Sequence, residues 1–255
     1  MWALTFIEKA DLKKHIKKTI AEKYYETLKS YDLTKFNDNI IDPIKLLFDS
    51  KIYKKKIEVI IAEEISRQRD KTNNNAIGYF HQHLFKYIKN CEVPNHGFDV
   101  IYKDSNKVFY VEMKNKHNTM NSSSAKTTYI KLLGKVLKNK NNYGLLVEVI
   151  SKHSQNVPWT TTVDSVRVSN ERIRRVSIDK FYELVTKQKN AFYCLCKEIP
   201  KLLDEVLFVS EELQVEDDVV VEQLKNIDSD LIKSLFSISF GSYIGFGDLP
   251  PNEDK

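Results

Sequence analysis

Hydrophobic and polar positions alternate most clearly in the middle of this 255-residue chain. β-Branched and aromatic residues dominate Asp99–Tyr102 and Lys107–Lys114, and a polar segment, Lys103–Asn106, separates them. This pattern predicts two strands joined by a hairpin turn. Apolar residues at helical spacing predict a helix over Tyr129–Lys138, and the continuous apolar segment Tyr143–Ile150 predicts a buried strand.

The remainder of the chain favours helices. Before residue 90, helical spacing predicts four of them, Ala10–Tyr31, Pro43–Leu47, Lys54–Arg69 and Asn75–Lys89, with a polar basic turn over residues 67–73. After residue 150 it predicts a strand at Arg172–Ile178, a helix that Asp179 opens at Phe181, and a helix at Asn190–Leu207. The strand, helix, strand order implies parallel neighbours, so we expect an α/β fold whose mixed central sheet is flanked by helices on both faces.

The predicted hairpin brings three chemical groups together. Folding back places Asp99 beside the end of the second strand. Residues two apart in a strand share a face, so Glu112 and Lys114 point the same way and Met113 points the other way. Two carboxylates and an amine suit hydrolysis of a phosphodiester with Mg²⁺ held by Asp99 and Glu112, while Lys114 orients and activates water. The alternative is structural: Asp99 caps a turn, and the other two form an exposed ion pair.

Charge next to this site favours a polyanion partner. Residues 101–140 contain nine Lys and only two acids, Asp104 and Glu112. The polar segment Asn115–Thr128 leads into the predicted helix, where hydroxyls, amides and free backbone N–H groups bind phosphate oxygens. A solvated lysine-rich face is the alternative for such a segment. We predict contacts to DNA from Lys116, His117, Asn118, Asn121, Ser122, Ser123, Ser124 and Lys126.

Composition narrows the remaining classes. With 42% apolar residues the chain can bury a full core. Its three cysteines, Cys91, Cys194 and Cys196, show neither paired spacing nor a secretory leader, which favours a reducing, cytoplasmic setting without a disulfide. The longest apolar runs are too short to span a bilayer, so we expect no membrane association.

The motifs that carry these residues resemble a known group. Asp99 followed by Glu112-Met-Lys114 is similar to the signature of the PD-(D/E)xK nuclease superfamily. The longer segments Asn75–Gln82, Gly97–Asp99 and Val111–Asn121 resemble one family of type II restriction endonucleases within it, which cuts GGNCC-type or GGWCC-type sites. Phe98 replaces the proline that usually precedes the first aspartate. Because that proline shapes a turn and does no chemistry, the resemblance stands.

The resemblance implies a restriction-endonuclease-like core and a further polar residue, on a helix before Asp99, that supports the metal or its water. Gln82 is the first candidate and Glu64 the second; a surface amide is the alternative for Gln82. His81 and His83 flank it, but residues two apart on a helix face away from each other, so we expect no zinc site there. The implied regions are a helical N-terminal region (1–72), a nuclease core (73–210) and an acidic C-terminal region that packs on the core (211–255).

The acidic region has a distinct charge. Between Asp204 and Asp230, ten acids stand against a single base, Lys225, so we expect this part to face away from DNA. The tail from Gly241 to Lys255 is expected to be a loose polar terminus.

The implied function is a Mg²⁺-dependent type II restriction endonuclease that cuts both strands of a short palindromic duplex and leaves 5′-phosphates. A two-fold site is matched most simply by a homodimer. The alternatives are a structure-specific or repair nuclease of the same superfamily, and an inactive DNA-binding protein, against which the intact trio argues. Bases would be read from the polar insertion Ser151–Asn170, unless it is only a surface loop. A site containing GG calls for Arg or Lys donors to guanine, and the candidates are Arg167, Arg172, Lys116 and Lys126.

Overall fold

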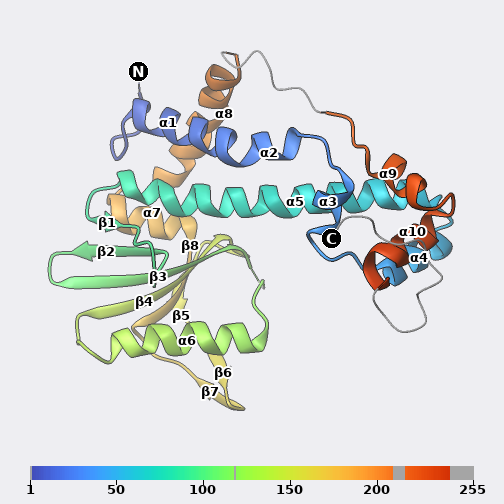
Figure 1. The fold of residues 1–255 in the computed structure, drawn as a ribbon. Coiled ribbons are helices and arrows are strands. Elements are labelled where there is room, and N and C mark those ends of the chain that lie inside the picture. The colour runs from blue at the N-terminus through green and yellow to red at the C-terminus, as the bar shows by residue number, and fades with distance from the viewer. Residues whose placement is uncertain (1, 118, 209–215, 242–255) are drawn as a thin grey trace. The chain divides into compact units, whose positions relative to one another are not determined.

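The computed structural model describes residues 2–117, 119–208 and 216–241 (Figure 1). The described residues form two compact units. The first combines Met1–Ile20 with Asn74–Glu211, and the second combines Ala21–Asn73 with Glu212–Lys255. In the part of the chain that the structure describes, no helix is long and apolar enough to cross a membrane.

A six-stranded sheet is the centre of the first unit. Its order is β1 (Cys91–Glu92), β2 (Val100–Asp104), β3 (Lys107–Lys116), β4 (Asn142–Ile150), β8 (Ile173–Ser177) and β5 (Asn156–Pro158). The β3, β4 and β8 strands are parallel, and the outer pairings are antiparallel. The predicted hairpin is confirmed as β2–β3, as is the mixed sheet. A separate two-stranded ribbon is formed by β6 (Thr161–Val163) and β7 (Val166–Val168).

Helices cover both faces of this sheet, which confirms the α/β class (Figure 1). One face carries α1 (Lys9–Thr19), the end of α5 (Ile57–Leu84), α7 (Ile178–Thr186) and α8 (Ala191–Leu207), and the other carries α6 (Ser122–Val136). A 3-10 turn (Phe85–Tyr87) follows α5 in this unit, whereas a π-helical turn (Ile20–Tyr24) leads from α1 to α2 (Tyr25–Leu28) of the second unit. The two-residue period of β3 separates the cores, because Phe109 and Val111 pack under α1 and α7 while Tyr110 packs under α6.

Helix α6 lies unusually close to β4. A Cβ added to Gly144 would stand 2.8 Å from Cβ of Leu132. Glycine at this position therefore lets Leu132, which is fully buried, approach the strand and pack with Leu146 and Ile173. This packing determines where the polar side chains of α6 reach the sheet.

The second unit is helical. It contains α3 (Leu33–Asn37), α4 (Pro43–Ile52), the beginning of α5, α9 (Val220–Ile227) and α10 (Leu231–Phe240). Buried Phe36, Leu46, Leu224 and Leu235 share its core. This arrangement differs from the division made from the sequence. Residues 2–20 lie in the unit of the sheet, and the apolar faces of α9 and α10 pack with helices of residues 21–73.

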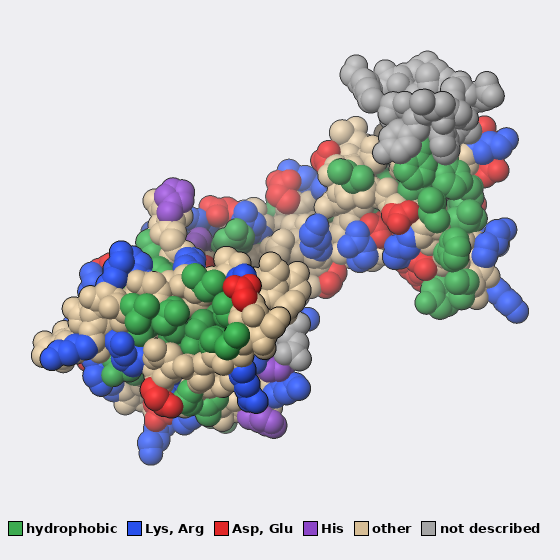
Figure 2. Space-filling model, turned by 90° about the horizontal axis from the view of Figure 1, so that it is seen from below, with side chains coloured by type: hydrophobic (Ala, Val, Ile, Leu, Met, Phe, Trp, Pro, Cys, Tyr) green, Lys and Arg blue, Asp and Glu red, His purple; other side chains and the backbone are tan. Residues whose placement is uncertain are grey.

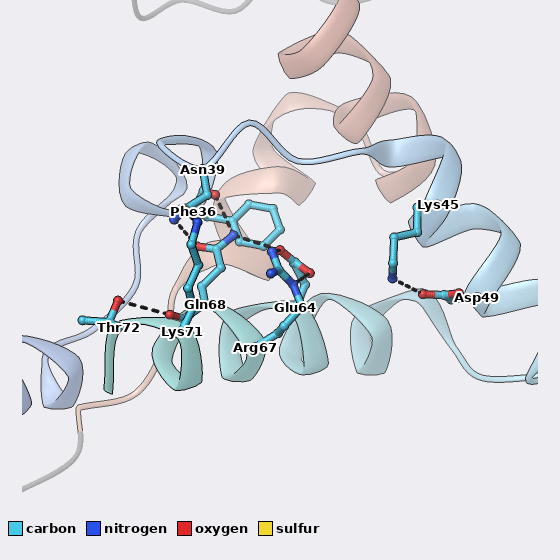
Figure 3. A network of polar contacts seen from close by, with 9 residues as sticks. All are labelled: Phe36, Asn39, Lys45, Asp49, Glu64, Arg67, Gln68, Lys71 and Thr72. Carbon is cyan, nitrogen blue, oxygen red and sulfur yellow. Dashed lines mark hydrogen bonds and ion pairs between the residues drawn. The ribbon is translucent and has the colours of Figure 1, made fainter. Parts of the chain in front are cut away.

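The predicted turn at residues 67–73 is wrong, because α5 runs through it without a break. The segment contains neither Gly nor Pro, and its polar side chains are satisfied within the second unit (Figure 3). Gln68, only 1% exposed, donates to the Phe36 carbonyl at 3.1 Å and to Glu64 at 3.2 Å, and it accepts from Asn39 at 3.2 Å. A polar run that reads as a turn is here part of a continuous helix, and Gln68 is its buried residue.

The predicted polar loop before α6 is also wrong in part. The helix begins at Ser122, seven residues before the predicted start at Tyr129. Asn121 is its N-cap and accepts a hydrogen bond from the backbone N–H of Ser124 at 2.8 Å. Ser122, Ser123 and Ser124 therefore form the exposed first turn of α6. The tail from residue 242 onward lies outside the described residues.

Candidate active site

Asp99 is fixed against β3 by two hydrogen bonds. Its backbone N–H donates to the Val111 carbonyl at 3.0 Å, and its Oδ2 accepts the Met113 N–H at 2.7 Å. The aspartate thus lies beside the part of β3 that carries Glu112 and Lys114. The sequence placed Asp99 at this point from the hairpin alone.

Glu112 is a buried carboxylate, only 8% exposed. Burial raises its pKa, and the charge of Asp99 raises it further. A hydrogen bond from Lys131 and the charges of Lys131 and Lys114 oppose that rise. The charges of Asp99 and Lys114 therefore both act on the Glu112 carboxylate.

Lys131 is a member of the site that the sequence did not single out. Its Nζ donates to Oε1 of Glu112 and to the Gly97 carbonyl, and it lies 4.7 Å from the centre of the Phe98 ring. The sequence shows a lysine-rich helix but not which lysine faces the strand. The available signal was indirect, since a buried carboxylate requires a cation from whatever packs on its face.

Gln82 contacts the site from α5. Its Nε2 donates to the backbone carbonyl of Asp99 at 3.3 Å. It also lines a cavity of about 410 Å³ together with Asp99 and Lys114. The cavity is completed by Asn74, Asn75, Gly78, Tyr79, Met113, Asn115 and Val149.

Glu64, the second candidate for this supporting role, belongs to the other unit. Its carboxylate accepts hydrogen bonds from Arg67 and Gln68 (Figure 3). Burial opposes ionisation of Glu64, but these two partners outweigh it and hold its pKa below the usual value. Glu64 therefore has a structural explanation, and of the two candidates it is Gln82 that the structure brings to Asp99.

A second buried carboxylate lies one strand away. Glu148 of β4 is paired with Lys114 in the strand register and is 1% exposed. Arg175 donates to it, and its Oε2 lies 3.0 Å from Nδ1 of His117. Burial opposes its ionisation, but the Arg175 and His117 hydrogen bonds hold its pKa below the usual range. This cluster was not predicted from the sequence, although an acid inside an apolar strand was a signal for it.

His117, which was predicted to contact DNA, belongs to this cluster. Its Nδ1 lies 2.8 Å from Nη2 of Arg175 as well as near Glu148. The ring is thus engaged in a buried network at the end of β3. The structure gives it a supporting position beside the site.

The other predicted DNA contacts gather around the start of α6. Figure 2 shows the face of the first unit that carries this helix, where Lys and Arg side chains surround a group of hydrophobic ones. Lys116 is exposed at the end of β3, and Lys126 is paired with Asp164 of the β6–β7 turn. Asn121 and the three serines that follow are exposed, and Asn118 lies outside the described residues.

Of the two arginines that are candidates for base recognition, one has a structural role and the other is exposed. Nη1 of Arg172 donates to the carbonyls of Val136, Asn139 and Asn142, so this side chain holds the end of α6 to β4. Arg167 is exposed on β7. The insertion from 151 to 170 contains β5 and the β6–β7 ribbon as well as loops.

The donors present suit a hydrated hard cation. Among the described residues, no three or more His, Cys, Asp and Glu side chains gather as a metal site. Mg²⁺ in phosphate chemistry is held by one or two carboxylates, keeps several waters and takes oxygens from the substrate. Asp99 and Glu112 fit that requirement, and they do not form the closed set of ligands of structural zinc.

Comparisons with known proteins identify the family of the chain. A family model, described as the Eco47II restriction endonuclease, matches residues 4–208. The chain belongs to the Eco47II restriction endonuclease family. It is 34% identical to the type II restriction enzyme Sau96I of Staphylococcus aureus over 211 aligned residues. The alignment covers 79% of this chain and 80% of that protein. It is also 26% identical to the type II restriction enzyme Eco47II of Escherichia coli over 182 aligned residues. That alignment covers 68% of this chain and 75% of the relative.

Membership of the Eco47II family confirms the resemblance that the motifs indicated. The matched span contains Gln82, Asp99, Glu112, Lys114 and Lys131. The whole sheet of the first unit and the helices on both of its faces also lie within that span. The fold and the candidate site thus belong to the part of the chain that defines the family.

Proposed function

We propose that this restriction endonuclease is a Mg²⁺-dependent, type II site-specific deoxyribonuclease that hydrolyses both strands of a short palindromic duplex. The observation that carries the proposal is that Asp99 is hydrogen-bonded to β3, the strand that carries Glu112 and Lys114, and that Asp99 and Lys114 line a cavity of about 410 Å³. Two carboxylates and an amine are groups that suit metal-assisted hydrolysis of a phosphodiester.

Each residue has a distinct role in this reaction. Asp99 and Glu112 hold the magnesium ion, which supplies charge stabilisation at the phosphate when it is bound. Lys114 orients the attacking water and stabilises the negative charge that develops on the phosphoryl oxygens. Gln82 positions the loop of Asp99 through the backbone carbonyl that it contacts. Water attacks phosphorus in line, the P–O3′ bond breaks, and a 5′-phosphate and a 3′-hydroxyl remain.

Family membership supports a proposal for the substrate and the assembly. Both relatives are named type II restriction enzymes, and the motifs resemble enzymes of GGNCC-type or GGWCC-type sites. A homodimer with one site for each strand is the simplest match to a two-fold sequence. Lys116, Lys126 and the first turn of α6 provide donors for phosphate, and Arg167 is an exposed candidate for guanine. A DNA substrate and three free cysteines favour action in the cytoplasm.

The proposal is tested by incubating the purified protein with phage-sized duplex DNA, with and without Mg²⁺, and sequencing the fragment ends. Discrete Mg²⁺-dependent fragments that share a palindrome and carry 5′-phosphates support it. Cleavage that follows junctions instead of sequence would indicate a structure-specific nuclease. Specific binding without any Mg²⁺-dependent product would indicate an inactive binding protein.

A further inference from the structure

The ammonium of Lys131 joins the two parts of the site that supply carboxylates. It contacts Glu112 on β3 and the Gly97 carbonyl in the turn that leads to Asp99. Its Nζ also lies 4.7 Å from the centre of the ring of Phe98, the residue between Gly97 and Asp99. One cation thus connects a strand, a turn and a helix at the point where a divalent ion would bind.

The backbone of Lys131 is held in place by its helix, while its side chain is partly exposed. The neighbouring Leu132 is fully buried against Gly144, which holds the backbone of α6 close to the sheet. The Lys131 side chain is 37% exposed, whereas the Glu112 side chain is 11% exposed. The Lys131 side chain is thus more exposed than the carboxylate that it contacts, which leaves it room to move away from Glu112.

We propose that Lys131 is a positioning residue that occupies Glu112 in place of a divalent cation and withdraws when that cation binds. This inference rests on the proposed function, because it takes Glu112 as a metal ligand. A buried carboxylate without a counter-charge is unfavourable, so the metal-free protein needs such a cation. An ammonium and a divalent ion on one carboxylate repel each other, so the two exclude each other. The flexible four-carbon stem of lysine permits the exchange.

The test uses Lys131→Met, which keeps the length of the stem and removes the charge. Lys135→Met is the matched control, since Lys135 lies one turn further along α6 and its Nζ is 5.8 Å from the same Phe98 ring. Mg²⁺ and Mn²⁺ are titrated calorimetrically into each full-length protein without DNA. Removing the competing charge is expected to tighten binding on the order of tenfold in Lys131→Met. Lys135→Met is expected to bind like the wild type.

Thermal unfolding gives a second readout. Without metal, Lys131→Met is expected to melt below the wild type, because Glu112 has lost its counter-charge. With saturating Mg²⁺ the difference is expected to close, so the metal-induced rise in Tm is larger in the variant. If Lys131→Met does not fold, Lys131→Gln replaces it.

The outcomes separate this inference from the function on which it rests. Unchanged or weaker metal affinity in Lys131→Met and Lys131→Gln, with a wild type that binds metal and a Glu112→Gln variant that does not, overturns the role of Lys131 alone. A wild type that binds no divalent ion, with or without duplex DNA, overturns the proposed metal site and this inference together.

Discussion

Oδ2 of Asp99 accepts the backbone N–H of Met113 at 2.7 Å, so the first carboxylate of the site is bonded to the strand that carries the second. One side chain thus has a structural contact and a proposed metal contact, and two substitutions separate them. Asp99→Asn keeps an acceptor for Met113 and removes the charge. Asp99→Ala removes both.

We expect Asp99→Asn to unfold at nearly the wild-type urea concentration while losing cleavage and the Mg²⁺ stimulation of DNA binding. Asp99→Ala should lose these as well and be less stable by about 1–3 kcal/mol, because the Met113 N–H loses its partner. Urea unfolding and filter binding with and without Mg²⁺ measure the two effects. Mg²⁺-stimulated affinity that survives in Asp99→Asn would remove Asp99 from the metal site.

Lys114 is expected to be needed for cleavage and not for binding. It lines the cavity beside Asp99, and its charge acts on Glu112. Lys114→Ala should lower the single-turnover cleavage rate on the order of 10³-fold, because a group that stabilises developing charge is lost. Specific binding should stay within a few-fold of the wild type.

Lys103→Ala is the control for Lys114→Ala, since Lys103 is an exposed strand lysine that is paired with Glu92. It should cleave and bind normally. If Lys114→Ala cleaved at the rate of the Lys103 variant, the assignment of Lys114 would be wrong.

Short-range pattern was enough to predict Asp99, Glu112 and Lys114, because a hairpin and a two-residue period determine all three positions. It could not predict Lys131, since the face of the sheet that α6 covers, and the depth at which it lies, depend on Leu132 and Gly144. The acid Glu148 was visible in the sequence, but its partners are distant in the chain: His117 follows β3 and Arg175 lies on β8. Long-range partners of this kind are not contained in local periodicity.

The error at residues 67–73 has the same origin. Local composition favoured a turn there, and the tertiary partners of Gln68 decided for a helix. The helix α6 is different, because Asn121 before a run of serines is a capping signal that is readable from the sequence. Its earlier start was therefore predictable in principle.

The contact between Gly144 and Leu132 predicts a stability defect. Gly144→Ala would place a Cβ 2.8 Å from Cβ of Leu132, so α6 must move away from β4. We expect a loss of about 1–3 kcal/mol in the free energy of unfolding. Gly134→Ala, in the same helix, meets nothing within 4 Å and should be neutral or gain up to about 1 kcal/mol from helix propensity.

Chemical denaturation measures both glycine variants. A Gly144→Ala protein as stable as Gly134→Ala would show that α6 does not need its close approach. The cleavage rate should fall together with stability in Gly144→Ala, because the helix that moves carries Ser122, Ser123, Ser124 and Lys126, the proposed phosphate contacts. Normal cleavage by a destabilised Gly144→Ala would argue against a role for the position of α6.

His81 predicts how stability depends on pH. Burial, with a smaller effect of the His15 charge, lowers the pKa of His81 to about 4, and its Nδ1 is buried without a hydrogen-bond partner in the described structure. The folded state therefore keeps this ring neutral, whereas the unfolded chain binds a proton near the ordinary value of about 6.5. Titration of His81 therefore does not lower the free energy of unfolding above that unfolded pKa. The free energy of unfolding decreases as the pH falls from there toward the folded pKa.

At about pH 5 the buried neutral ring of His81 should lower the free energy of unfolding by roughly 2 kcal/mol relative to its value at neutral pH. His81→Gln does not titrate at this position, so this variant should not show that loss. The measurement is the free energy of unfolding in urea at about pH 7.5 and about pH 5 for both proteins. His153→Gln is the control, because His153 lies in an exposed loop and should leave the pH dependence of the wild type intact. If His81→Gln lost as much stability between the two pH values as the wild type, the ring would be protonated in the fold, and its burial would have to be relieved by water.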